Sequence, residues 1–142
     1  MKRRVLLDSN MLISAFDHDP TNPAHVQARK ELRALLADSE VSVAITPLVS
    51  FEVLRKPTRV SPTELEAKLN RFQNLKIGKP EAHRAAELFR LARDNKQYKR
   101  ENLERLSFDI FHCVCAESND LEIVSKDGDI PFIQQLITDS RQ

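Results

Sequence analysis

The chain has 142 residues, of which 41% are hydrophobic and 30% are charged, as expected for one soluble globular domain spanning residues 1–142. No apolar run approaches the roughly 20 residues that span a bilayer, and the short stretch before Asp8 does not resemble a signal peptide, so a cytoplasmic protein is expected. The net charge of +1 identifies no partner, because nucleic-acid binding depends on where basic residues lie.

Hydrophobic periodicity and turn signals predict strands that alternate with helices. The predicted strands are residues 4–7, 41–45, 75–77 and 121–124. The predicted helices are residues 11–16, 24–37, 47–56, 62–72, 80–91 and 108–117, with a last one from about 129. Alternation of this kind calls for right-handed crossovers and a parallel sheet covered on both faces, which is an α/β fold.

Several local signals support these boundaries. Thr46 is placed to cap a helix with Pro47 at its first position, and Ser107 is placed to cap the helix that begins at Phe108. Residues 94–105 are highly charged and lack an apolar stripe, so they are expected to form a mobile connection or an exposed helix end. With only two glycines, the chain has no Gly-rich phosphate loop.

The two cysteines, Cys113 and Cys115, are two positions apart in a predicted helix. This spacing places their side chains on different faces, so they are unsuited to pairing with each other or to holding a metal. Buried structural thiols are expected.

Four acidic residues have a common position relative to the predicted sheet. Asp8 and Asp127 directly follow the first and last strands, Asp109 lies in the first turn of its predicted helix, and Glu52 lies on the helix after the second strand. In an open α/β sheet, ligands bind outside the carboxyl ends of the strands. If the strands are neighbours, the four acids can meet in one crevice.

Carboxylates gathered in one place repel one another unless a cation is present. A set of oxygen ligands without Cys or His selects hard ions such as Mg²⁺ or Mn²⁺. Such ions can activate water and stabilise a phosphodiester in hydrolysis.

Each acid also has an ordinary structural interpretation. Asp8 is suited to capping a helix, Asp109 to complementing a helix dipole, and Glu52 to facing solvent. Asp127 is suited to a turn before Gly128. Only the shared position of the four favours a site.

Four segments together resemble the motifs of PIN domains, including the VapC-type toxins of bacterial toxin–antitoxin pairs. These segments are Val5–Asn10, Thr46–Val53, Phe108–Ala116 and Ile123–Asp129. The resemblance covers nearly the whole chain. It implies a three-layer α/β/α fold with a central parallel sheet of four to five strands.

The resemblance also implies roles for individual residues. Asp8, Glu52, Asp109 and Asp127 would be catalytic metal ligands for Mg²⁺ or Mn²⁺, and Asn10 and Ser125 would support the pocket by hydrogen bonds. Ser125 stands where the family more often has threonine. The aromatic residue usual after the fourth motif is absent, so Asp129 stays open as the alternative to Asp127, which we prefer.

Further residues are candidates for contact with substrate. His112 lies one turn after Asp109 and either assists substrate or packs within the fold. The charged stretch that contains Lys96, Tyr98, Lys99 and Arg100 either binds RNA or is a solvated loop.

The function implied by the resemblance is an endoribonuclease, with an antitoxin protein as partner if it is a toxin. Apolar side chains near Leu48 and Leu69 offer a homodimer surface. A receiver-type phospho-acceptor domain also gathers acids around Mg²⁺, but it fits poorly because no paired acids follow the first strand. A catalytically idle PIN fold that binds RNA is a third hypothesis, disfavoured by the presence of all four acids.

Overall fold

The computed structural model of the chain describes residues 2–17, 21–56, 60–94, 103–125 and 128–141. Its described strands form one all-parallel four-stranded sheet, and the elements alternate as expected for an α/β protein. The predicted fold class, with its parallel sheet, is therefore confirmed. The chain forms two compact units, one from residues 1–76 and 122–126 and the other from residues 77–121 and 127–142.

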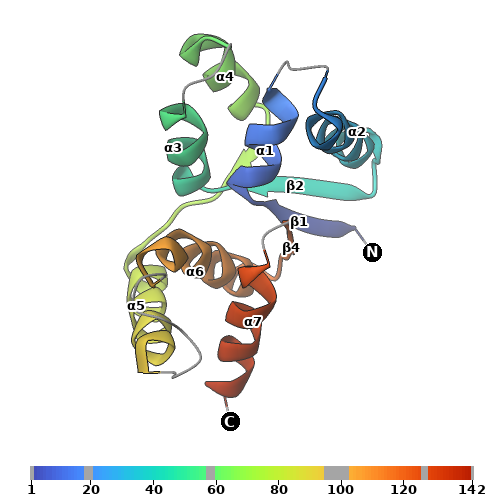
Figure 1. Cartoon of the computed structure of the whole chain (residues 1–142). Helices are drawn as coiled ribbons and strands as arrows, with labels where there is room; N and C mark the ends of the chain where they lie inside the picture. The colour runs from blue at the N-terminus through green and yellow to red at the C-terminus, as the bar shows by residue number, and fades with distance from the viewer. Residues whose placement is uncertain (1, 18–20, 57–59, 95–102, 126–127, 142) are drawn as a thin grey trace. The chain divides into compact units, whose positions relative to one another are not determined.

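The first unit contains the sheet. Its strands are β1 (Arg3–Leu7), β2 (Val41–Ile45), β3 (Gln73–Asn74) and β4 (Glu122–Val124), in the order β3-β2-β1-β4. Its helices are α1 (Ser9–Phe16), α2 (Pro23–Ala37), α3 (Pro47–Arg55) and α4 (Pro62–Leu69), drawn with the sheet in Figure 1. Leu6 pairs with Ala44 of β2 and Ile123 of β4, so β1 lies between these two strands.

One hydrophobic core joins the sheet to the helices of this unit. Leu7 and Ile45 from the sheet, Leu12 from α1, Leu32 from α2 and Val49 from α3 are all buried in it. The apolar stripes of the helices supply most of the burial that orders them, because short helices are marginal on their own.

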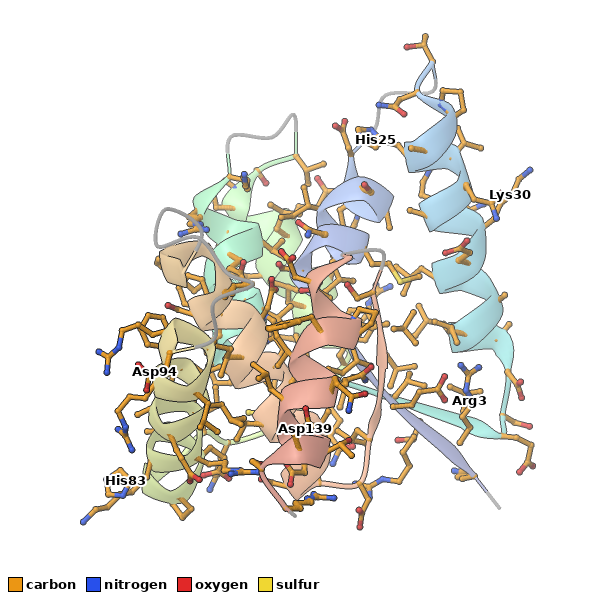
Figure 2. All side chains as sticks on the ribbon, turned by 60° about the horizontal axis from the view of Figure 1, so that its bottom comes forward. Arg3, His25, Lys30, His83, Asp94 and Asp139 are labelled. Carbon is orange, nitrogen blue, oxygen red and sulfur yellow. The ribbon has the colours of Figure 1, made fainter. Side chains whose placement is uncertain are left out.

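An ion pair joins the N-terminal ends of β1 and β4. The guanidinium group of Arg3, labelled in Figure 2, donates to both carboxylate oxygens of Glu122 at 2.8 and 2.7 Å. This contact raises the pKa of Arg3 and lowers the pKa of Glu122. Because both groups are exposed, the pair contributes to strand register more than to stability.

The second unit is helical. It contains α5 (Lys79–Asp94), α6 (Leu103–Ser118) and α7 (Asp129–Asp139), which pack pairwise against one another. Leu88, Ile110 and Ile133, one from each helix, are fully buried. Arg84 of α5 donates to the Ser140 hydroxyl at 2.7 Å, which ties α5 to the C-terminal end of α7.

Most predicted boundaries agree with the structure. The strand at residues 41–45 is confirmed, and the helix capped by Thr46 begins at Pro47. The helix predicted from residue 11 begins earlier, at Ser9, because Asp8 caps it. The helix predicted to reach residue 72 ends at Leu69.

The prediction of a strand at residues 75–77 is wrong. The strand is Gln73–Asn74, and only the backbone N–H of Leu75 continues the ladder, by donating to Ile45 at 2.8 Å. β3 is an edge strand held by backbone pairing, and its side chains are exposed. The apolar residues after it therefore misled the prediction.

The cap predicted at Ser107 is also wrong. α6 begins at Leu103, so Ser107 lies inside the helix and Asp109 is its seventh residue, outside the first turn. Leu106, Ile110 and Val114 are all buried and follow helical spacing, which extends the apolar stripe past Ser107. Asp109 therefore does not complement the N-terminal dipole.

Cys113 and Cys115 are both buried free thiols, as predicted.

The two leucines named for a dimer surface differ in exposure. Leu69 is only 3% exposed within the core, so its own side chain cannot line such a surface, whereas Leu48 is half-buried. None of the helices in the described ranges combines the length and the hydropathy of a membrane-spanning segment.

Candidate functional site

The carboxyl edge of the sheet in the first unit carries polar residues. Asp8, Thr46 and Ser125 directly follow β1, β2 and β4, respectively, and parallel strands end at the same edge. Asp8 and Thr46 are buried, with 1% and 0% of their surface exposed. Buried polar side chains need partners, and both have them.

Asp8 is held from three sides. Its backbone N–H donates to the Val124 carbonyl at 3.2 Å, which fixes it beside the end of β4. Its Oδ1 accepts from the backbone N–H of Ser9 at 2.7 Å, and its Oδ2 accepts from the Ser125 hydroxyl at 2.6 Å. The carboxylate is therefore oriented by donors from Ser9 at the start of α1 and from Ser125 directly after β4.

This geometry makes Asp8 the N-cap of α1. The capping interpretation and the ligand interpretation do not exclude each other, because an ionised carboxylate offers about four acceptor positions. Ser9 and Ser125 are among the donors to these positions. The N-terminal end of α1 also favours negative charge at this position.

Sequence reasoning did not single out Ser9. It is 2% exposed, and its hydroxyl lies 3.5 Å from Asp8 Oδ1. The available signal was its place directly after an acid at the end of a buried strand, where any polar side chain lies against that acid.

The two other predicted residues of the first unit differ in exposure. Glu52 lies on α3, whose N-terminus is capped by Thr46 Oγ1 accepting from Val49 N–H at 3.3 Å, and it is half-buried. α3 packs against α1. Asn10, in the first turn of α1, is exposed.

The second unit carries an acid and a histidine on one face of α6. Asp109 and His112 are three residues apart, and a carboxylate oxygen of the first lies within 4.8 Å of a ring nitrogen of the second. His112 is 1% exposed, and Asp109 is half-buried. This pair can hold a cation, or the ring can orient the carboxylate.

Asp129 is the first residue of α7 and is half-buried. Its alternative, Asp127, lies outside the described residues, and so do four predicted substrate contacts, Lys96, Tyr98, Lys99 and Arg100. The structure therefore brings Asp8 to Ser125 in one unit and Asp109 to His112 in the other.

The groups here that can hold a metal ion are carboxylates and one imidazole. Carboxylate oxygens are the ligands that Mg²⁺ and Mn²⁺ prefer, and an imidazole nitrogen suits the later first-row metals better. A buried, oriented carboxylate such as Asp8 is suited to ligating an ion, since its partners fix its direction in advance.

Comparison with known proteins gives a family match. The model of the PIN domain family matches residues 5–134, which includes every described residue of the candidate site. A search of curated proteins gives no significant match.

Proposed function

The chain belongs to the PIN-domain family, and on this basis we propose that it is a metal-dependent endoribonuclease that hydrolyses RNA phosphodiester bonds. PIN domains are typically metal-dependent nucleases that act on RNA. The observation that carries the proposal is Asp8, a buried carboxylate fixed by Ser9 and Ser125 at the carboxyl edge of the sheet.

We assign Asp8, Glu52, Asp109 and Asp127 to the metal, with Asp129 as the alternative to Asp127. The donor chemistry fits Mg²⁺ or Mn²⁺, which when bound activates water and stabilises charge on the phosphate. Ser125 orients Asp8 through the 2.6 Å hydrogen bond. His112 is assigned to orienting Asp109, because a ring that is 1% exposed is poorly placed to touch a large substrate.

We further propose a biological setting. The protein acts in the cytoplasm as the toxin of a type II toxin–antitoxin pair, with an antitoxin protein as its partner. Expression alone should then inhibit growth, and coexpression of a small DNA-binding protein encoded beside it should relieve the inhibition. If the protein cleaves RNA in vitro but its expression does not affect growth, the toxin role is rejected and the nuclease activity is not.

The nuclease is tested by Asp8→Asn, which keeps the size of the side chain but removes its charge. RNA cleavage in Mn²⁺ should fall by about 100-fold or more, as expected when a metal ligand is lost. Asp38→Asn is the matched control, since Asp38 is an exposed cap residue of the same unit. EDTA should abolish cleavage by the control and by the wild-type protein.

Near-normal cleavage by folded Asp8→Asn protein, purified free of host nucleases, would reject the mechanism and favour an idle RNA-binding module. Asp127→Asn and Asp129→Asn decide the fourth acid, because only the true ligand should lose most activity. A melting curve must accompany each variant, so that lost activity is separated from lost fold.

A further inference from the structure

A cavity of about 520 Å³ lies in the first unit, away from the residues assigned to the metal. Its walls come from the C-terminal end of α1, from α2 between Arg29 and Leu36, and from the chain between the end of α4 and β3. The side chains that line it are Ala15, Phe16, Arg29, Leu32, Arg33, Leu36, Lys68, Arg71 and Phe72. This volume is within the range of small-molecule sites.

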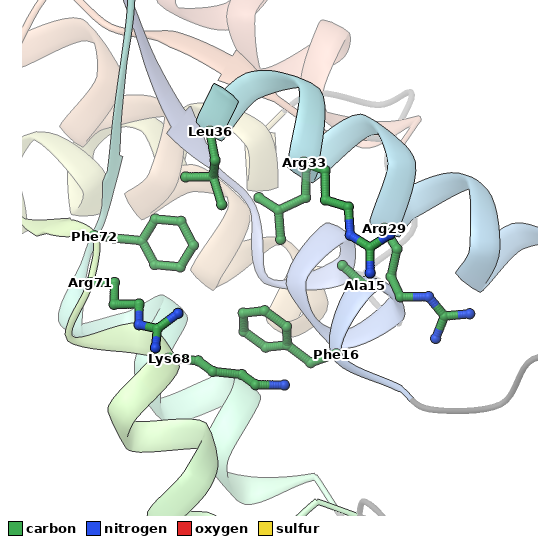
Figure 3. Close-up of a pocket in the computed structure, with 9 residues that line it drawn as sticks. Ala15, Phe16, Arg29, Arg33, Leu36, Lys68, Arg71 and Phe72 are labelled. Atoms are coloured by element: carbon green, nitrogen blue, oxygen red, sulfur yellow. The ribbon is translucent and has the colours of Figure 1, made fainter. Parts of the chain in front are cut away.

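Apolar side chains form the inner surface of the cavity. Leu32 and Phe72 are buried in the core, and Phe16 is half-buried. Leu36 is 55% exposed, which is high for so large an apolar group. Figure 3 shows Leu36 and the rings of Phe16 and Phe72 facing a common space, which an apolar or aromatic body would fill.

Cationic side chains surround this apolar surface, and none of the described residues that line it is acidic. Two of the cations are engaged. Arg29 donates to the Asp17 carbonyl at 2.6 Å, and Lys68 lies 5.3 Å from the centre of the Phe16 ring and 4.0 Å from Glu64.

The other two cations are available. Within the described residues, the guanidinium groups of Arg33 and Arg71 make no hydrogen bond or ion pair, and both residues are exposed. They come from different elements, α2 and the segment after α4, and border the same cavity (Figure 3). Two convergent, unneutralised cations beside an apolar wall complement an anion that carries an apolar body.

We propose that this cavity binds a small amphipathic anion, with its carboxylate or phosphate held by Arg33 and Arg71 and its apolar body against Phe16, Leu36 and Phe72. Size favours a small ligand over a protein partner. The cavity volume lies in the range of small-molecule sites, and Arg33 and Arg71 suit one anionic group. Binding here requires neither RNA nor metal, so this proposal can be tested independently of the nuclease activity.

The test is calorimetric titration of the full-length protein with decanoate and with decyl phosphate, both below micelle formation. One molecule should bind per chain. Decanol, which has the same apolar body without the charge, should bind at least about tenfold more weakly, equal to roughly 1.4 kcal/mol. Comparing the two anions distinguishes a carboxylate ligand from a phosphate ligand.

Two double variants separate site binding from general attraction. Arg33→Gln with Arg71→Gln should weaken decanoate binding about tenfold. Lys30→Gln with Lys76→Gln removes the same charge from exposed positions outside the cavity and should leave it nearly unchanged. Figure 2 shows Lys30 pointing outward from α2.

Several results would overturn the proposal. Equal affinity for decanol would indicate a merely apolar cavity, and equal weakening by both double variants would indicate unspecific charge attraction. If no small anion binds but a helical peptide rich in Leu and Glu does, the cavity is part of a protein interface. If only a single-stranded RNA oligonucleotide binds, it extends the RNA surface.

Discussion

Removal of the Ser125 hydroxyl is the sharpest test of how the structure prepares Asp8 for metal. Ser125→Ala deletes the donor that lies 2.6 Å from Asp8 Oδ2 and changes nothing else in the side chain. A hydrogen bond to a charged group contributes about 1.5–3 kcal/mol. Loss of a partner that orients a metal ligand costs about 10- to 100-fold in affinity or activity, which corresponds to roughly 1.4–2.7 kcal/mol. The two estimates agree.

The assay is RNA cleavage as a function of Mn²⁺ concentration. Ser125→Ala should move the half-saturating Mn²⁺ concentration upward by about 10- to 100-fold, with a smaller loss of rate at saturation. Ser125→Thr, which keeps the hydroxyl, should restore the metal dependence. Ser42→Ala is the control, because Ser42 is a half-buried serine of β2 in the same unit. An unchanged Mn²⁺ dependence in folded Ser125→Ala protein would refute the reasoning.

Two further predictions concern stability. Burial, and secondarily the charge of Glu81, raises the pKa of Cys115 from 9.0 to about 11. As the pH rises, the thiol therefore ionises in the unfolded chain before it ionises in the folded protein. The free energy of unfolding should fall by up to roughly 3 kcal/mol between these two pH values and stay unchanged below them. Urea titrations should show a flatter pH profile for Cys115→Ala, and identical profiles would contradict this. Thr46→Ala removes the cap of α3 and should cost about 1 kcal/mol in the same titrations, while Thr46→Ser should recover most of it.

Much of the fold followed from local signals that tertiary packing reinforces. The strand at residues 41–45 and the cap at Thr46 are encoded in short patterns, and the structure has both. The prediction of the third strand failed because β3 is an edge strand of two residues held by backbone pairing, so its sequence carries no apolar pattern. The prediction of where α6 begins failed because Ser107, a suitable cap residue, lies inside a longer apolar stripe.

The candidate site was predictable in part for a related reason. A residue that ends a buried parallel strand lies at the carboxyl edge of the sheet whatever its side chain does, so Asp8 and Ser125 could be placed from the strands alone. The hydrogen-bond partner of each side chain could not be predicted in this way. The hydrogen bond between Ser125 and Asp8 joins residues 117 positions apart, and only the pairing of β4 beside β1 creates it.

The geometry of Asp8 makes its capping role compatible with a role as metal ligand. A helix that begins directly after a parallel strand needs an N-cap at the carboxyl edge, which is also where ligands bind in α/β folds. The capping bond to Ser9 orients Oδ1, and the Ser125 hydroxyl orients Oδ2. The interactions that begin α1 therefore also fix the direction of the carboxylate before any ion arrives. Asp8→Asn keeps the Oδ1 acceptor for the cap, so it should affect metal binding far more than the stability of α1.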